Sequence, residues 1–226
     1  MSRVIVFDIM GTLLDFQALD PYFERFFGDT AIRKEWFTQT LQLAMAAMLT
    51  NAYEEFGVQA DTGLEITARR YKVSLLGEEK NLILSTVRKL RPYPEVARNL
   101  QRLRDAGLRL AALTNSTAKT AEAQLTYTGL RDHFEQVISA DEIQCFKPSP
   151  EIYHLAAKRM SVELEQMRLV AAHDWDVTGA LRAGCAAAFV ARPGQVMNPF
   201  GPQPDVKGAD LAEVAENILA VELEQG

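Results

Sequence analysis

The first apolar run of the chain predicts a buried strand. Residues 4–7 are β-branched or aromatic without interruption, and they lead into Asp8, with Gly11 three residues later. A short apolar run that ends in a polar residue and a nearby glycine is typical of a central strand followed by a tight loop. The chain is therefore expected to begin on a strand in the middle of a sheet.

The next long block follows a helical pattern. From about Phe16 to Leu90 the apolar residues recur every three or four positions, and no strand pattern interrupts them. Examples are Tyr22, Phe23, Phe26, Phe27, Trp36, Leu41, Ala44, Met45 and Met48. The run Arg91-Pro92-Tyr93-Pro94 closes the block, because prolines favour extended backbone and end a preceding helix. This block is expected to be all helix.

After residue 94 the pattern alternates between strands and helices. Apolar runs predict strands at 108–113, 137–138, 169–172 and 187–190. Helical spacing predicts helices from Val96 to a cap at Gly107, then at 118–128, 152–160, 175–183 and 210–223, and residues 193–204 form a loop rich in Gly and Pro. Strands that alternate with helices of roughly 10–15 residues indicate an α/β fold with a parallel, doubly wound sheet.

Composition narrows the class of protein. The 226 residues are 48% hydrophobic and 24% charged, which excludes a disordered chain. The net charge of -6 argues against a nucleic-acid or membrane surface and favours a small-molecule partner. Cys145 and Cys185 suit neither a disulfide framework nor a zinc site, and no apolar run near the N-terminus is long enough for a signal peptide. A cytoplasmic location is expected, and a homodimer stays open.

Polar residues follow four of the predicted strands. They are Asp8 with Thr12, then Thr114-Asn115-Ser116, then Lys147, and finally His173-Asp174-Trp175-Asp176. Ligands of an open parallel sheet bind outside the carboxyl ends of the strands, so these side chains are expected to converge on one crevice. Together they supply a nucleophile, hydrogen-bond donors, a cation and a second carboxylate.

These segments resemble the four motifs of the haloacid dehalogenase superfamily. The matching runs are Phe7-Asp8-Ile9-Met10-Gly11-Thr12-Leu13-Leu14-Asp15, Thr114-Asn115-Ser116, Lys147-Pro148-Ser149-Pro150-Glu151-Ile152-Tyr153 and Trp175-Asp176-Val177-Thr178-Gly179-Ala180. The resemblance implies a Rossmann-like core, residues 1–14 and 93–226, with a helical cap inserted at residues 15–92. The inserted cap agrees with the helical block inferred separately from the spacing of apolar residues.

Two positions depart from the phosphatases of this superfamily. Those enzymes carry an Asp general acid two residues after the nucleophile, where this chain has Met10, and a thioether can neither donate nor accept that proton. They also carry a magnesium-binding Asp where this chain has Ala171. A magnesium-dependent phosphatase that uses Asp8, Asp174 and Asp176 remains the alternative, and Mg²⁺ is expected only under it. The main interpretation requires no metal and no cofactor.

The closer resemblance is to the type II L-2-haloacid dehalogenases, which hydrolyse small 2-halo carboxylic acids through an aspartyl ester. A halide leaves as an anion and needs no proton, so Met10 in place of the acid does not impair that reaction. The resemblance implies that Asp8 is the nucleophile and that Thr12 and Thr114 donate hydrogen bonds beside it. It also implies that Asn115 contacts the halide and that Lys147 neutralises Asp8 with support from Tyr153. Asp176 is expected, on the same resemblance, to orient the lysine and the hydrolytic water. Ser116 completes the expected substrate-binding loop, and Tyr153 is also expected among the residues that bind substrate.

The chain also departs from the dehalogenase pattern. An arginine of the family's cap helps to receive the halide, and its position falls on Phe37 here. His173 stands where the family has Asn, and it is expected to replace that residue as a donor or water activator. Met10 and Phe37 are candidate pocket residues, whereas Met45 and Met48 are assigned to packing. A catalytically silent descendant that binds a small acid or a partner protein is the third interpretation.

Overall fold

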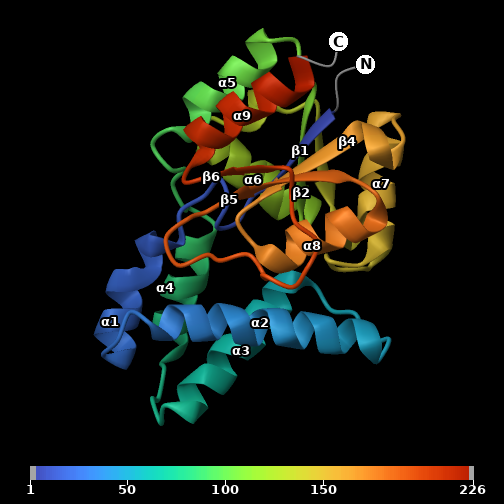
Figure 1. Cartoon of the computed structure of the whole chain (residues 1–226). Coiled ribbons are helices and arrows are strands. Elements are labelled where there is room, and N and C mark those ends of the chain that lie inside the picture. Colours follow the sequence, from blue (N-terminus) through green and yellow to red (C-terminus); the bar gives the residue numbers. More distant parts are fainter. Residues whose placement is uncertain (1–3, 224–226) are drawn as a thin grey trace.

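The computed structural model describes residues 4–223 and contains a six-stranded sheet (Figure 1). Its strands are β1 (Val4–Asp8), β2 (Leu110–Thr114), β3 (Gln136–Ser139), β4 (Met167–Ala171), β5 (Ala186–Val190) and β6 (Val206–Gly208). They pair in the order β3-β2-β1-β4-β5-β6, and every neighbouring pair is parallel. The expected α/β class and the central position of β1 are confirmed. The strand order reverses between β1 and β4, which is where ligands bind in such sheets.

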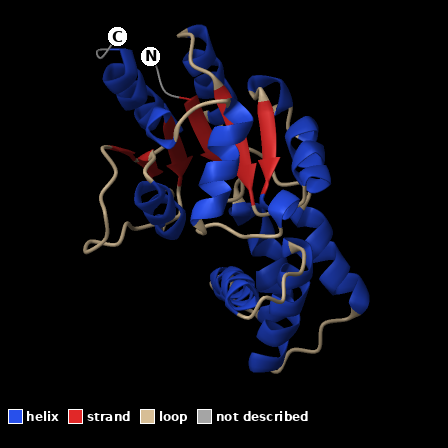
Figure 2. Ribbon diagram, turned by 90° about the vertical axis from the view of Figure 1, so that its right-hand side faces the viewer, coloured by secondary structure: helices blue, strands red, loops and turns tan. Residues whose placement is uncertain are grey.

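Helices cover both faces of the sheet (Figure 2). One face packs against α5 (Val96–Asp105), α6 (Ala118–Tyr127) and α9 (Leu211–Leu223), and the other against α7 (Pro150–Met160) and α8 (Asp174–Ala183). Strand β1 contributes to the core on both faces: Ile5 and Phe7 belong to one core cluster, and Val4 and Val6 belong to the other. Successive side chains of a strand point to opposite faces, so a continuous apolar run serves both layers.

A helical segment, residues 16–90, lies beyond the carboxyl ends of the strands, below the sheet in Figure 1. It consists of the 3-10 helix η1 (Phe16–Leu19), α1 (Asp20–Phe27), α2 (Ile32–Leu49), α3 (Phe56–Arg70) and α4 (Gly77–Val87). Buried Trp36 on α2 donates its indole N–H to the carbonyl of Ala60 on α3 at 2.9 Å, which joins the two helices. The expectation of an all-helical block is confirmed for these residues.

The chain enters and leaves the helical segment through two short connecting segments that are hydrogen-bonded to each other. Leu14 and Pro92 form an isolated antiparallel bridge, the Asp15 N–H donates to the Arg91 carbonyl at 2.9 Å, and the Tyr93 N–H donates to the Leu13 carbonyl at 3.0 Å. This pairing stands outside the main sheet. The helical segment is therefore attached to the sheet by one narrow double connection.

The structure differs from the sequence-based expectation in short elements. Strand β6 follows the loop at 193–204 and was not expected, because a three-residue strand is too short to show a period of two. The 3-10 helices η2 (Arg131–His133), η3 (Ala140–Ile143) and η4 (Leu164–Gln166) were missed for the same reason. Strand β2 begins at Leu110, because Leu108 donates its N–H to Leu103 and closes α5. No helix within residues 4–223 is long and apolar enough to cross a membrane.

Candidate active site

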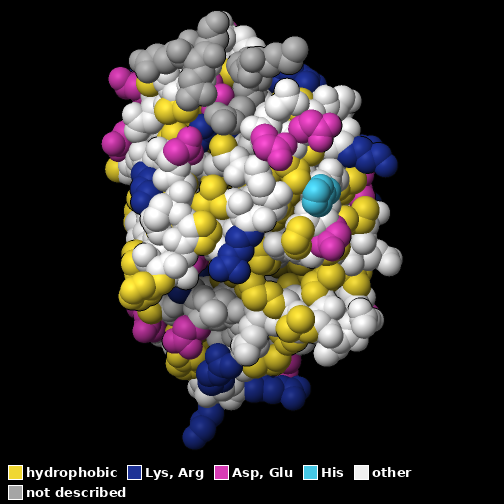
Figure 3. Space-filling model, turned by 45° about the vertical axis from the view of Figure 1, so that its right-hand side comes forward, with side chains coloured by type: hydrophobic (Ala, Val, Ile, Leu, Met, Phe, Trp, Pro, Cys, Tyr) yellow, Lys and Arg dark blue, Asp and Glu magenta, His cyan; other side chains and the backbone are white. Residues whose placement is uncertain are grey.

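Four separate segments converge at the carboxyl ends of β1, β2 and β4. Asp8 is the last residue of β1 and Thr114 the last of β2, His173 follows β4, and Lys147 follows η3. A small pocket between these segments and the helical segment is lined by Asp8, Met10, Phe37, Leu41, Phe56, Thr114, Asn115, Ser116, Lys147, His173 and Trp175. Figure 3 shows hydrophobic side chains around a hollow at mid-height of one face, where the two parts of the molecule meet.

Lys147 is buried between two carboxylates. Its ammonium Nζ donates to Asp8 Oδ1 and to Asp176 Oδ2, both at 2.7 Å, and to the Leu113 carbonyl at 3.1 Å. Burial alone would lower the pKa of Lys147, but the charges of Asp176 and Asp8 outweigh it and the pKa is raised. The lysine therefore stays charged and holds Asp8 in place.

Asp176 lies behind the lysine and is fully buried. Its Oδ1 accepts a 2.7 Å hydrogen bond from the Tyr153 hydroxyl, and its Oδ2 accepts from Lys147. Burial raises the pKa of Asp176, and Lys147 offsets part of that rise. Burial and the negative charge of Asp176 raise the pKa of Tyr153 well above its ordinary value, so its hydroxyl remains a donor. Neither Asp176 nor Tyr153 lines the pocket.

The second oxygen of Asp8 is held by Thr12. The Thr12 hydroxyl donates to Asp8 Oδ2 at 2.6 Å, and it accepts a hydrogen bond from the Ala172 N–H at 2.9 Å. This arrangement ties the loop after β1 to the end of β4. Asp8, unlike Asp176, lines the pocket, so it is the carboxylate of this pair that a ligand can meet.

His173 closes another side of the pocket. Its Nε2 lies 2.8 Å from the Met10 carbonyl, to which it can only donate, and 3.8 Å from Asp8 Oδ2. The ring stacks on Trp175, with centroids 5.3 Å apart, and lies 5.5 Å from the ring of Phe37. Gly11, with a φ of +79°, leaves room for this ring, since a Cβ there would lie 3.0 Å from Nε2.

The loop after β2 completes the pocket. The Thr114 hydroxyl oxygen accepts from the Ser116 N–H at 3.1 Å, and Asn115 Oδ1 accepts from the Lys147 N–H at 2.9 Å. Thr114 therefore stabilises the turn that carries Asn115 and Ser116. The bond from Lys147 to Asn115 fixes the two loops relative to each other.

The sequence-based candidates fall into two groups. Eight of them line the pocket: Asp8, Met10, Phe37, Thr114, Asn115, Ser116, Lys147 and His173. Thr12, Tyr153 and Asp176 stand behind it and act on the lining residues, although Tyr153 was expected among the residues that bind substrate. Sequence reasoning missed Leu41 and Phe56 as lining residues, whereas Trp175, inside the fourth motif, was expected at the crevice but was given no role.

The residues of this site do not fit a magnesium ion. Lys147 Nζ occupies the position between the two carboxylates, and both oxygens of Asp176 already accept hydrogen bonds. Met10 offers a thioether and Ala171 no donor at all, whereas Mg²⁺ demands several oxygen ligands. Within residues 4–223, no group of three or more His, Cys, Asp or Glu side chains is arranged to hold a metal.

A parallel sheet with a buried aspartate at the end of its first strand, paired to a lysine after the third, defines the class of hydrolases that use an aspartate nucleophile on a Rossmann-like core. The comparison of sequences names the family. The model of the haloacid dehalogenase-like hydrolases matches residues 2–184, and the chain belongs to that family of enzymes.

Individual relatives cover nearly the whole chain. An (S)-2-haloacid dehalogenase of Pseudomonas sp. (strain YL) is 28% identical over 214 residues, 94% of this chain and 92% of the relative. One from Xanthobacter autotrophicus is 31% identical over 202 residues, 86% and 77% of the two chains. Among solved structures, this chain superposes with a TM-score of 0.88 on the structure of L-2-haloacid dehalogenase from Xanthobacter autotrophicus with chloropropionic acid covalently bound. The two are 25% identical, and the match covers 98% of this chain and 99% of the other.

Proposed function

We propose that this hydrolase displaces halide from a 2-halo carboxylic acid, with Asp8 as the nucleophile. The observation that carries the proposal is the pairing of Asp8 with Lys147 in a pocket that has no acid at position 10. Halide departs without protonation, so a nucleophile and a neutralising cation are sufficient. The similarity to relatives named as 2-haloacid dehalogenases supports the same reaction.

In the first step, a carboxylate oxygen of Asp8 attacks the halogen-bearing carbon from the side opposite the halogen. A carbon–oxygen bond forms, the carbon–halogen bond breaks, and the halide leaves with the electron pair. Asn115 and Trp175 line the pocket beside Asp8 and are the groups proposed to receive the halide. Ser116, in the loop after β2, is proposed to hold the substrate carboxylate.

In the second step, water attacks the Cγ of Asp8 and releases a 2-hydroxy acid. The ester bond from Cγ to the former aspartate oxygen breaks, the product oxygen takes one proton, and one proton passes to solvent. Asp176 is proposed to act through Lys147, to which it is hydrogen-bonded at 2.7 Å. His173, 3.8 Å from Asp8, is proposed to position the water.

We further propose that residues 15–92 act as a cap over a core formed by residues 1–14 and 93–226. The paired connection at Leu14 and Pro92 supports a hinge there. The pocket holds only about 20 Å³, room for roughly one water molecule. Movement of the cap would therefore admit the substrate. The free thiols of Cys145 and Cys185 support a reducing compartment such as the cytoplasm.

The test is a screen for halide release run beside a screen for phosphate release, each with and without EDTA. The proposal predicts halide release from 2-chloro or 2-bromo acids that survives chelation and is lost in Asp8→Asn. Magnesium-dependent release of phosphate would favour the phosphatase alternative. Absence of both activities, with a small acid still bound, would favour a catalytically silent descendant.

A further inference from the structure

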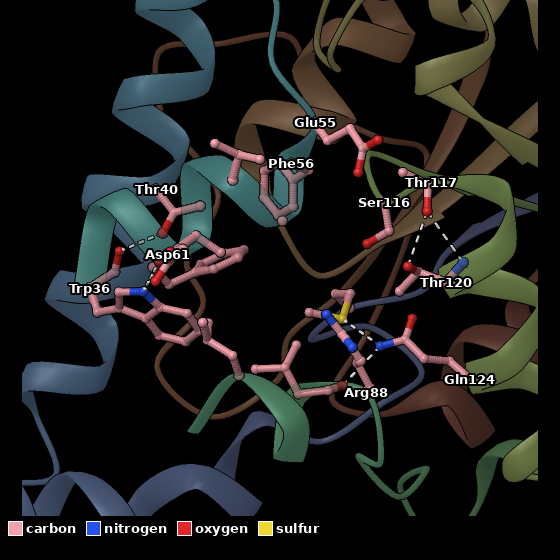
Figure 4. Close-up of a pocket in the computed structure, with 17 residues that line it drawn as sticks. Trp36, Thr40, Glu55, Phe56, Asp61, Arg88, Ser116, Thr117, Thr120 and Gln124 are labelled. Atoms are coloured by element: carbon pink, nitrogen blue, oxygen red, sulfur yellow. Dashed lines mark hydrogen bonds between the residues drawn. The ribbon is translucent and has the colours of Figure 1, made fainter. Parts of the chain in front are cut away.

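A second, larger cavity adjoins the catalytic pocket. It measures about 350 Å³, and it shares Met10, Phe37, Phe56 and Ser116 with the small pocket at Asp8. Figure 4 shows that its walls come from both parts of the molecule. Trp36, Thr40 and Asp61 face it from the helical segment, and Thr117, Thr120 and Gln124 face it from the end of β2 and from α6.

The two volumes decide what each space can hold. About 20 Å³ beside Asp8 accepts roughly one water, whereas a cavity of roughly 150 Å³ is enough for benzene. The neighbouring 350 Å³ therefore has room for a ring or a chain of several carbons. Met10 and Ser116 line both spaces, so the two spaces adjoin, and a group attached to the carbon at Asp8 would reach the larger one by passing these side chains.

The lining of this cavity has an apolar wall that suits an aryl or alkyl group, beside polar and charged residues that include Glu55, Asp61 and Arg88. Trp36, Phe56, Leu84 and Val87 contribute aromatic and aliphatic surface. Two lining residues have a buried oxygen without a hydrogen-bond partner, Asp61 and Gln124. Asp61 Oδ1 is ion-paired with Lys80 Nζ at 2.9 Å, whereas Gln124 donates its amide to Met10 Sδ and to the Val87 carbonyl and leaves its Oε1 without a partner. An apolar substituent cannot donate to this oxygen, so a water molecule held in the cavity beside the substituent is expected to satisfy it.

Another cavity, of about 740 Å³, shares Phe37, Leu41, His173 and Trp175 with the small pocket but is a weaker candidate for an apolar group. It is lined in part by Arg33 and Arg192, which would attract an anionic group. Both cations are already paired, Arg33 with Asp20 and Arg192 with Glu95.

We infer that the 350 Å³ cavity is the subsite for the substituent on the reacting carbon, and that the substrates are 2-halo acids with a benzyl-sized or longer alkyl group there. This inference rests on the proposed function for its chemistry, because Asp8 must attack the carbon that carries the substituent. It goes beyond that function by naming the size and polarity of the substrate. The smallest haloacids, which leave the cavity empty, would be poor substrates.

Gly57 is an exposed position at the edge of the cavity where an added side chain has room to turn inward, and it does not line the pocket at Asp8. It lies on α3 and lines the cavity, and a Cβ at this position would meet no atom within 4 Å. Gly77, the first residue of α4, has equally open space and lines none of the cavities described here. Gly57→Phe is therefore the test variant, Gly57→Leu an intermediate one, and Gly77→Phe the matched control.

The experiment measures kcat/KM for 2-chloropropanoate and for 2-chloro-3-phenylpropanoate, together with calorimetric binding of propanoate and 3-phenylpropanoate. We expect the unmodified enzyme to favour the phenyl compounds by about tenfold or more. Gly57→Phe should abolish that preference, Gly57→Leu should reduce it, and Gly77→Phe should preserve it. Turnover of 2-chloropropanoate should change less than about twofold in all three variants.

The two possible failures are distinguishable. If 3-phenylpropanoate binds no better than propanoate, or if Gly57→Phe leaves the preference intact, the subsite is wrong whatever the turnover. If the binding preference holds and responds to Gly57→Phe, but no halide is released from any haloacid, the subsite stands and the proposed dehalogenation fails.

Discussion

Lys147 Nζ lies 2.7 Å from Asp8 Oδ1, although the two residues are 139 positions apart in the sequence. Both side chains are almost fully buried, at 1% and 6% exposure. A buried carboxylate is costly unless it is paired, so the lysine makes it possible to keep the carboxylate of Asp8, the proposed nucleophile, in a nearly closed pocket. This contact links the first and third motifs of the chain.

Removal of the lysine is expected to destabilise the fold as well as stop turnover. Lys147→Met leaves Asp8 and Asp176 buried without their shared cation, and loss of one partner of a buried pair costs about 3–5 kcal/mol. Urea unfolding measures this cost. Adding Asp176→Asn should recover part of it, because one of the two unpaired charges is gone. A decrease of less than about 1 kcal/mol in the free energy of unfolding of Lys147→Met would contradict this explanation.

Gly179 is expected to tolerate no side chain. A Cβ there would lie 2.6 Å from the Tyr153 hydroxyl oxygen and 2.6 Å from Pro148 Cβ. Gly179→Ala should therefore displace Tyr153 from Asp176, reduce the free energy of unfolding by about 1–3 kcal/mol and lower kcat. Gly77→Ala on α4, where a Cβ meets nothing within 4 Å, is the control. Equal effects of the two substitutions would show that the close packing at Gly179 has no role.

His173 is expected to matter in the second chemical step. Without the ring that lies 3.8 Å from Asp8 Oδ2, water is poorly positioned and the ester should persist. His173→Ala should lower kcat by about a hundredfold and accumulate an adduct on Asp8, visible as substrate minus halide in the intact mass. His173→Asn, which retains a donor, should recover part of the rate. If His173→Ala is slow but no adduct accumulates, the slow step is halide displacement, and His173 acts in the first step instead.

Cys185 is expected to make stability fall at high pH. Burial, with the charges of Glu165 and Asp176, raises its pKa from 9.0 to about 12. In the unfolded chain the thiol ionises near 9.0, so between these values the unfolded state binds fewer protons and stability decreases as pH rises. Between pH 9 and about 10.5, the free energy of unfolding measured in urea titrations should fall by about 1–2 kcal/mol less in Cys185→Ala than in the unmodified protein. Parallel profiles would contradict this assignment.

Much of the fold could be predicted because its elements repeat a strong pattern. The apolar run ending at Asp8 and the later alternation of strands and helices gave the parallel sheet, and helical spacing from Phe16 to Leu90 gave the inserted segment. Each of these signals spans many residues and reflects burial on one or two faces. Strand β6 lacked such a signal, since its three residues are too few to show an alternating pattern.

The candidate site was predictable where the chemistry follows a strand end, as with Asp8, Thr114 and His173. Contacts across the two parts of the molecule were not. Phe56 lines the pocket only because α3 is placed over the sheet, and nothing in its local sequence indicates that position. The hydrogen bond of Tyr153 to Asp176 instead of to the lysine likewise depends on how α7 packs against α8.

A single turnover in water enriched in ¹⁸O tests the central claim most directly. With enzyme in excess over a 2-halo acid, peptide mass spectrometry locates the heavy oxygen, and Asp8→Asn serves as the inactive control. If Asp8 forms the ester, water attacks Cγ, so the label should appear in the carboxylate of Asp8 while the hydroxyl of the product remains unlabelled. Label found in the product and absent from Asp8 would mean that water attacks the substrate directly, and the account of Asp8 as nucleophile would be wrong.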